Sequence, residues 1–583
     1  MTHEQGEYET YEQKISGLEN VVNQQRQGRS HSDIYYADFD TFSTIDRSRF
    51  VYWFGNEILE LFSSHTQVRT VADAMNGLQT GDNERFVRKW WEISKDDLDD
   101  YEWFVKSGGD QPYYDSCDNL VYWENDGEKI KSHSSSSVRN TEFYNQEGIN
   151  FRDFSKHFTA RLHTSDQIFS DTAHFVLPDD YDRHTLLGYL CSTLSRYLMD
   201  GLNPTLHFKV GDVESLPISE DLIKSEVPEL ASTAVNKQRR IFGIDDSSPD
   251  FDPGWLVENF EEILYYRDIL KADLAVIHGK IDEIVFNEFG ISNEAQERVT
   301  SEFPDSVLKY PLLETERDLG DFRDELNIQR NEIDEKEIAE YIKDNIDESI
   351  TDIAREMEVS PHSIADLKAI NDLYDPDEKE TVAAALITYY LGEIFGHKTP
   401  VRSAEGEREI LPVTGSAKKG AVDELKDRIE RDFEDNEQIV EIIERRLDTS
   451  IQSYIMNEFF ESHHCKQYRR RGQRIPVYWQ LESPEGAFSC FLYYHDINEN
   501  TLPKLRGQYL DPRIDELENE LETLNAQTSG DDPDKELLKR KDEVQNDLDD
   551  IREFRETIDE MIDDGVTVDV EKGIWENIKE WDQ

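Results

Sequence analysis

AHFVLPDDYDRHTLLGYLCSTLSRYLMDGLNP, residues 173–204, places a strand pattern directly before a helix pattern. The run AHFVLP (173–178) is apolar and bounded by turn residues, which is typical of a β-strand. The segment 184–204 predicts a helix, because Gly201 and Pro204 mark its end and leucines recur at three- and four-residue spacing. These leucines are Leu187, Leu190, Leu194 and Leu198. The stretch therefore predicts a mixed α+β domain.

The segments on either side extend this pattern. NLVYWENDG (119–127) and LHFKVGD (206–212) also predict strands bounded by turns. Downstream the chain becomes helical, with two amphipathic helices expected in 254–290, the second ending at Gly290. The apolar run TVAAALITYYLGEIFG (381–396) predicts a buried helix, and the Gly- and charge-rich stretch 402–420 predicts a linker.

The C-terminal part combines strands with paired helices. RIPVYWQL (474–481) and AFSCFLYYHD (487–496) predict strands. Two helices follow around the turn QTSGDDPD (527–534), and their apolar positions predict a hairpin that packs only on itself or offers a surface to a partner. These positions are Ile514, Leu517, Leu521 and Leu524 in the first helix and Val544, Leu548, Ile551 and Ile558 in the second.

The charge balance is strongly acidic, with 127 Asp and Glu against 63 Lys and Arg, a net charge of −64. In dilute buffer such a chain repels polyanions, which argues against DNA. The alternative is a halophilic surface, because in about 1 M salt the Debye length is about 3 Å and counterion release contributes little. DNA binding would then depend on short-range hydrogen bonds and local basic clusters. We favour the halophilic surface, although net charge alone does not decide.

Cysteine usage and hydropathy indicate the cell compartment. The four cysteines contain no Cys-x-x-Cys pair, which fits a reducing compartment. No apolar run of about 18 residues is present, and the first residues have no apolar signal core. We therefore expect a soluble cytoplasmic protein with no membrane partner. The cysteines are Cys117, Cys191, Cys465 and Cys490.

The sequence lacks the common catalytic motifs and contains one group of possible metal ligands. An amino-methyltransferase needs a Gly-rich loop after a strand for S-adenosylmethionine and an Asn/Asp-Pro-Pro-Tyr/Phe turn for the flipped base. The sequence contains neither, nor a Walker loop or His-Glu-x-x-His. Its densest metal-like group could bind zinc, but adjacent ligands cannot all face one ion, so ordinary packing is favoured. That group is His463, His464 and Cys465, with Cys490 and His495 downstream.

GLQTGDNERFVRKWWE (77–92) is the most informative stretch for function. Gly77 and Gly81 allow tight turns, and the polar and cationic residues beside them suit contact with a phosphate or a base edge. A surface turn before an aromatic strand is the alternative reading of this composition. The polar and cationic residues are Thr80, Asn83, Arg85, Arg88 and Lys89.

This stretch resembles the opening of the target-recognition domain in adenine-specific methyltransferases of the PglX type, the modification enzymes of BREX phage-defence systems. The likeness continues in order through several blocks, strongest at 37–218 and 469–524 and weakest at 300–450. In the block 139–161, Phe151 stands where the family usually has Trp. The blocks are ADFDTFSTIDRSRFVYWFGNEILELF (37–62), KSGGDQPYYDSCDNLVYWENDG (106–127), RNTEFYNQEGINFRDFSKHFTAR (139–161), LCSTLSRYLMDGLNPTLHFKVGDVESLPI (190–218), KIDEIVFNEFGIS (280–292) and RRRGQRIPVYWQLESPEGAFSCFLYYHDINENTLPKLRGQYLDP (469–512).

The resemblance implies an α+β organisation in six parts. A mixed α/β recognition domain is followed by an extended helical region and a small α+β C-terminal module with a helical hairpin. The expected parts are a polar lead-in (1–34), a connector (35–70), the target-recognition domain (71–222), a helical spacer (223–300), an acidic helical domain (301–460), and the strand module with its hairpin (461–583).

The family's catalytic domain precedes this connector, and here only a few dozen residues do. The resemblance therefore implies a recognition subunit whose catalytic domain is a separate polypeptide, or a truncated relic. We expect no cofactor in this chain and S-adenosylmethionine in the catalytic partner. The other implied partners are double-stranded DNA and further proteins of the defence system. A non-catalytic scaffold is the alternative function, and a methyltransferase with a hidden catalytic site is a third.

Ten residues are predicted to contact DNA. The cluster KQYRRRGQR (466–474) is the strong basic segment of this acidic chain, and it either clamps phosphate or neutralises nearby Glu-rich helices. The predicted residues are Thr80, Gly81, Asn83 and Arg85, then Arg88, Lys89 and Arg139, and in the basic cluster Arg469, Arg470 and Arg471.

Overall fold

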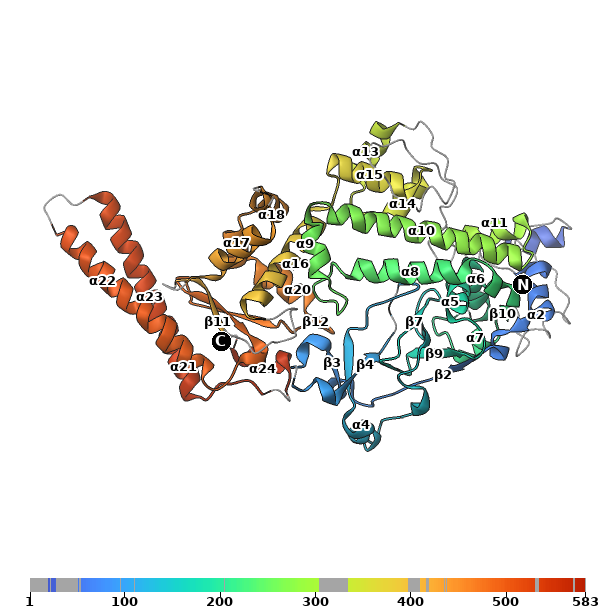
Figure 1. Cartoon of the computed structure of the whole chain (residues 1–583), viewed down its shortest axis with the longest axis horizontal. Coiled ribbons are helices and arrows are strands. Elements are labelled where there is room, and N and C mark those ends of the chain that lie inside the picture. The colour runs from blue at the N-terminus through green and yellow to red at the C-terminus, as the bar shows by residue number, and fades with distance from the viewer. Residues whose placement is uncertain are drawn as a thin grey trace.

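The computed structural model confirms the α+β class: helices and several small sheets follow one another along the chain (Figure 1). The expected lead-in lies largely outside the described residues, and the domain boundaries stay predictions. Within the described part, no helix is both long enough and apolar enough to cross a bilayer. The structure describes residues 19–20, 22–27, 51, 54–94, 96–107, 109, 111–203, 205–302, 334–396, 409–415, 419–434, 436, 438–529, 534–569 and 572–581.

Two four-stranded sheets form the first part of the chain. Their facing side chains share a small core that includes Leu78, Phe104 and Phe175. The strand expected at 173–178 is confirmed as β9 (Ala173–Pro178), which pairs with a strand on each side and whose residues 173–176 are buried on both faces. One sheet has the order β2 (Ala72–Met75), β9, β6 (Gly148–Arg152), β7 (Ala160–His163), and the other β3 (Val87–Lys89), β5 (Asn119–Tyr122), β4 (Tyr101–Val105), β8 (Gln167–Phe169).

Two expectations for the segment after β9 are wrong. The single helix expected over 184–204 is two helices, α5 (Arg183–Cys191) and α6 (Thr193–Leu202). Ser192 between them is extended, and its side chain caps α6 by accepting the N–H of Ser195. The strand expected over 206–212 is instead a single bridge at His207 followed by α7 (Val210–Glu214).

Long helices run beside this part of the molecule. The helices α8 (Val227–Phe242) and α10 (Ile263–Glu288) pack against each other and span most of its width (Figure 1). The two helices expected in 254–290 are confirmed as α9 (Pro253–Glu258) and α10, and Gly290 follows with a φ of +66°.

A group of three short helices packs on α10. They are α13 (Glu335–Asp344), α14 (Ile350–Glu356) and α15 (Pro361–Asn371). Buried polar pairs join α15 to α10: His362 Nε2 lies 2.7 Å from Asp273 Oδ1, and Lys368 Nζ lies 3.3 Å from Asp268 Oδ2. In each of these two pairs a buried carboxylate thus has a partner.

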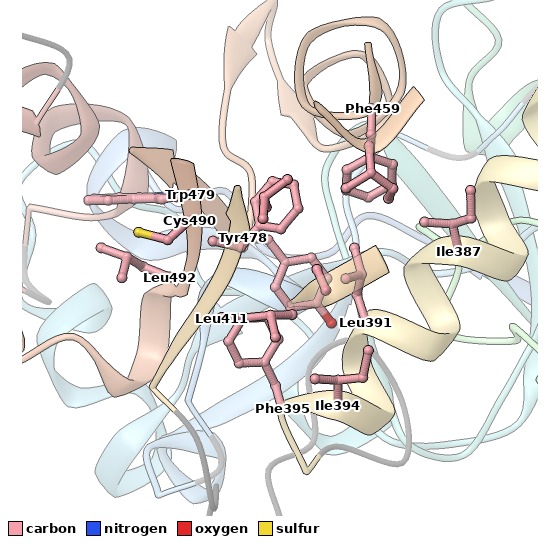
Figure 2. Close-up of a cluster of buried hydrophobic side chains, with 14 of the residues drawn as sticks. Ile387, Leu391, Ile394, Phe395, Leu411, Phe459, Tyr478, Trp479, Cys490 and Leu492 are labelled. Atoms are coloured by element: carbon pink, nitrogen blue, oxygen red, sulfur yellow. The ribbon is translucent and has the colours of Figure 1, made fainter. Parts of the chain in front are cut away.

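A third sheet organises the C-terminal core. The buried helix expected over 381–396 is confirmed as α16 (Pro376–Ile394), and it packs against the sheet β11 (Ile410–Thr414), β15 (Ser489–Tyr493), β14 (Tyr478–Glu482). Figure 2 shows the apolar side chains between them, with Phe395 stacked on Tyr478 at 5.3 Å between ring centroids. The strands expected near 474–496 are confirmed, whereas the expected linker contains β11, so that expectation is wrong for 410–414.

The C-terminal helices form the expected hairpin. The helices α22 (Asp511–Gln527) and α23 (Lys535–Asp563) pack side by side and project from the body (Figure 1). The hairpin does not pack only on itself, because Asp550 of α23 accepts the N–H of Ala487 at 3.0 Å, and Phe554 stacks on Phe488.

The remaining elements are short or peripheral. They are α2 (Gly55–Ser64), β1 (Thr66–Gln67), α3 (Asn83–Phe86), α4 (Glu124–Lys131), β10 (Pro217–Ile218), α11 (Asn293–Glu302), α17 (Ala421–Asp432), α18 (Ile439–Leu447), α19 (Ile451–Asn457), α20 (Cys465–Gln467), β12 (Arg469–Arg470), β13 (Gln473–Arg474), α21 (Thr501–Leu505) and α24 (Ile574–Trp581).

Candidate nucleic-acid interface

The motif loop, residues 77–83, is a tight turn that leads into α3. Thr80 is buried, and its hydroxyl donates to Asn83 Oδ1 at 2.7 Å. Asp82 caps α3 by accepting the N–H of Arg85, and Gly81 has a φ of +76°, which favours glycine. The amide oxygen of Asn83 is engaged within the loop, so its amide nitrogen remains as a donor toward a ligand.

A second loop, residues 137–140, contacts the motif loop and the residue before it. Gln79 and Ser137 form an antiparallel bridge, and Asn140 Nδ2 donates to the carbonyl of Asn76 at 2.9 Å. These contacts place the exposed Arg139 beside the motif loop. The structure therefore brings together two sites that the sequence predicted separately.

The cations after the motif loop differ in exposure. Arg85 is exposed beside the ring of Phe86, and no carboxylate of the described residues lies within ion-pair distance of it. Arg88 is buried, and its Nη1 donates to the carbonyls of Glu84 and Val87. Lys89 is mostly buried and pairs with Asp118. The arrangement leaves Arg85 as the accessible cation, whereas Arg88 and Lys89 hold the local fold together.

The arginine hairpin, residues 469–474, approaches from the C-terminal core. Arg470 reaches β3, where its Nη1 donates to the Val87 carbonyl at 2.8 Å and lies 3.2 Å from the buried Glu92 carboxylate. Arg469 Nε donates to the Cys465 carbonyl at 2.8 Å. Arg471 lies at the turn with a φ of +53° and is exposed. The basic cluster is thus divided: Arg470 neutralises a buried glutamate, while Arg471 stays available.

The motif loop and the arginine hairpin meet at one cavity of about 440 Å³, which we call the cationic cavity. Five cationic and three anionic side chains line it, although acidic residues outnumber basic ones about twofold in the whole chain. The local charge is therefore reversed, which suits a polyanion. The cationic side chains are Lys89, Lys106, Arg161, Arg470 and Arg471, and the anionic ones are Glu84, Asp115 and Asp118.

Lys106 is the lysine of this cavity that has no ion-pair partner among the described residues. Burial, together with the nearby charges of Arg471, Arg470 and Lys89, lowers the pKa of Lys106 to about 8. Arg161 pairs with Asp115 at 3.0 Å, and Lys89 and Arg470 also have carboxylate partners, whereas Arg471 stays available. Lys106 and Arg471 are thus the cations of the wall that an anion entering the cavity would pair with.

Lys106 and Arg161 were not singled out from the sequence. Both lie in blocks of the family resemblance, Lys106 directly before a glycine turn and Arg161 at a block's end. A cation beside a glycine turn in so acidic a chain was the available signal for Lys106. Arg161 offered no such signal, because its place in the wall depends on the pairing of β7 with β6.

The three histidines of the expected metal-like group each have a separate hydrogen-bond partner. His463 Nε2 lies 3.1 Å from Asp246, His464 Nε2 accepts the N–H of Tyr478, and His495 Nε2 faces the Trp91 carbonyl at 2.9 Å. Burial lowers the pKa of His464 to about 3. Across the described ranges, no group of three or more potential ligands is placed to hold a metal ion.

Comparison with known proteins gives two relatives. The adenine-specific methyltransferase BrxX of Escherichia coli O9:H4 (strain HS) is 23% identical over 575 residues, which cover 91% of this chain and 44% of that protein. The adenine-specific methyltransferase PglX of Lacticaseibacillus casei (strain Zhang) is 23% identical over 581 residues, which cover 93% of this chain and 45% of that protein. No family model matches the chain. Over most of its own length the chain is similar to these two adenine-specific methyltransferases, and it spans less than half of their length.

Proposed function

We propose that this chain recognises the target site on double-stranded DNA for an adenine-specific methyltransferase of a BREX-type phage-defence system. We further propose that a separate catalytic polypeptide binds S-adenosylmethionine and transfers the methyl group. The observation that carries the proposal is the convergence of the motif loop and the arginine hairpin, distant in sequence, on one cationic cavity. Two relatives named as adenine-specific methyltransferases support it.

The contacts divide between positioning and reading. Phosphate contacts fix the register of a protein on DNA, whereas contacts to base edges carry the sequence information. Lys106 and Arg471 line the cationic cavity and would hold phosphate. Arg85, Arg139 and the amide nitrogen of Asn83 lie on or beside the motif loop and would donate to acceptors on base edges.

The separate catalytic polypeptide is proposed from the sequence. An amino-methyltransferase holds the target amine with an Asn/Asp-Pro-Pro-Tyr/Phe turn, and the 583 residues contain no such tetrapeptide. S-adenosylmethionine-dependent methylation of DNA by the purified chain alone would overturn this part. A chain that binds the methyltransferase but shows no DNA sequence preference would be a scaffold and would overturn the recognition role.

Replacing both Asn83 and Arg85 with alanine tests the recognition surface. We expect methylation at the native target to be abolished, because a base-reading donor of the motif loop and the accessible cation of α3 beside it are lost together. Long-read sequencing of genomic DNA measures the methylation, and circular dichroism checks the fold. Glu84→Ala is the matched control, since it removes an anion from the same helix and should preserve or strengthen modification. Unchanged methylation in the double variant would exclude the motif loop from target reading.

The protonation of Lys106 predicts a pH dependence of DNA binding. Its pKa of about 8 means that the ammonium is present below this pH and is lost as the pH rises above it. We expect affinity for the target duplex to fall about fivefold between pH of about 7 and about 9, because one phosphate contact loses its charge. Lys106→Arg should flatten the profile, since arginine stays protonated in this range. Equal pH profiles for both proteins would contradict the role of Lys106.

A further inference from the structure

A second cavity, of about 610 Å³, is lined by residues of α8, α10 and α14, and we call it the helical cavity. The segments 111–113 and 158–159 of the first part of the fold complete its lining. Its volume lies in the range of about 300–1,000 Å³ that small-molecule sites occupy. It shares no lining residue with the cationic cavity, so the proposed DNA contacts do not use it.

One face of each long helix lines the helical cavity. On α8 the lining residues are spaced three and four residues apart, which places Gln238, Ile241 and Phe242 on the same face. On α10 the same spacing brings Lys271 and Leu274 together. The three apolar side chains among these are only partly buried. The cavity therefore has an apolar wall that carries one amide and one ammonium group.

Gln238 is a buried residue whose amide has no hydrogen-bond partner in the described part of the chain. It is 6% exposed and lines the cavity. The preceding residue, Lys237, is paired, because its Nζ donates to Asp273 Oδ2 of α10 at 2.6 Å. Buried polar groups are nearly always hydrogen-bonded, and one left unpaired destabilises the fold. A ligand with complementary donors and acceptors would remove this cost.

Lys271 is a partly buried cation of the same wall. None of the carboxylates in the described ranges lies within ion-pair distance of its ammonium group. Burial, together with the nearby charge of Arg267, lowers the pKa of Lys271. Two further cations, Arg196 and Arg355, and one anion, Asp352, line the cavity, although acidic residues outnumber basic ones about twofold in the whole chain. The lining therefore favours a ligand that carries negative charge.

We infer that the helical cavity binds an adenine nucleotide. A glutamine amide can donate to and accept from the edge of adenine at the same time, which suits Gln238. The flat face of the base would lie on the apolar wall beside Phe242. The phosphate would pair with Lys271. S-adenosylmethionine fits this lining less well, because its sulfonium and amino groups bring positive charge to a cationic cavity. The inference goes beyond the proposed function and does not depend on it.

Isothermal titration calorimetry with the full chain tests the site, with adenosine monophosphate (AMP) as the probe. We expect AMP to bind, and adenosine, which lacks the phosphate, to bind about tenfold more weakly. Lys271→Met should weaken AMP binding about tenfold and leave adenosine binding unchanged, because it removes the charge and keeps the apolar stem. Gln238→Leu should weaken the binding of both, because it removes the contact with the base edge. Lys280→Met is the matched control, since Lys280 lies on α10 outside the cavity lining and should not affect AMP binding.

Thermal melts without ligand separate a binding role from a structural one. Because neither side chain has a partner among the described residues, Lys271→Met and Gln238→Leu should melt at or above the wild-type temperature. A lower melting temperature of both variants would show that the two residues hold the fold together, and would overturn the inference.

Four binding results would also overturn the inference. They are the absence of AMP binding by the wild type, equal AMP affinity of Lys271→Met and the wild type, tighter binding of S-adenosylmethionine or guanosine monophosphate than of AMP, and binding of a short adenine oligonucleotide but not of AMP. None of these measurements involves the methylation target. Failure of the nucleotide site therefore leaves the proposed recognition of duplex DNA intact.

Discussion

Replacing Arg470 with alanine should lower the free energy of unfolding by about 3 kcal/mol, because it leaves a buried carboxylate without its counter-ion. Glu92 is 4% exposed, and its Oε1 accepts the Lys89 N–H and lies 3.2 Å from Arg470. Burial raises the pKa of Glu92, and Arg470 is the largest influence that lowers it. Arg470 also donates to Val87 on β3, so the substitution weakens the contact that brings the arginine hairpin to the motif loop.

Urea unfolding of Arg470→Ala, compared with that of Arg469→Ala, measures the effect. Arg469→Ala is the control in the same strand, because its exposed side chain donates to one carbonyl and should cost about 1 kcal/mol or less. Burial already raises the Glu92 pKa above its usual value, and loss of Arg470 raises it further, so the extra loss of stability should grow as the pH increases above the raised Glu92 pKa of the wild type. Arg470→Met with Glu92→Gln should recover part of the stability. Equal stability of the two alanine variants would contradict this account.

The local sequence pattern was sufficient to predict much of the fold, but it failed where contacts between residues distant in sequence decide the structure. The strand β9 and the hairpin of α22 and α23 follow from apolar spacing alone. The break between α5 and α6 does not, since the leucine spacing continues across it. There the N–H of Thr193 donates to Asp282 of α10 at 2.7 Å, a partner that no local pattern identifies. The helix α7 had a local signal, because Asp212 accepts the Lys209 N–H at its first turn.

The residue types of the candidate site could be predicted from the sequence, but the exposure of each side chain could not. Arg85, Arg88 and Lys89 look alike in sequence, and only packing shows that Arg88 serves backbone carbonyls while Arg85 faces solvent. The meeting of the motif loop with the arginine hairpin depends on how the C-terminal core packs on β3. That packing is set by side chains such as Trp91, whose Nε1 donates to the Ile475 carbonyl at 3.2 Å.

The close approach at Gly77 predicts the second large effect. A Cβ at this position would lie 2.0 Å from the Phe169 carbonyl oxygen and 2.5 Å from its ring, so Gly77→Ala cannot be accommodated without moving backbone. Leu78 N–H donates to the same carbonyl at 2.9 Å, and the Phe169 ring stacks on Phe175 at 4.6 Å. We expect a loss of about 3 kcal/mol from overpacking and a weakened hydrogen bond.

Displacement of Gly77 should also move the motif loop, because this residue begins it. Gly77→Ala should therefore lose target methylation even at temperatures where it remains folded, whereas a purely global effect would track its unfolding curve. Gly507→Ala is the control, since a Cβ there meets no atom within 4 Å and should be neutral or slightly stabilising. Thermal melts and genomic methylation at several growth temperatures separate the two effects. A Gly77→Ala protein with wild-type stability and methylation would show that this contact does not position the loop.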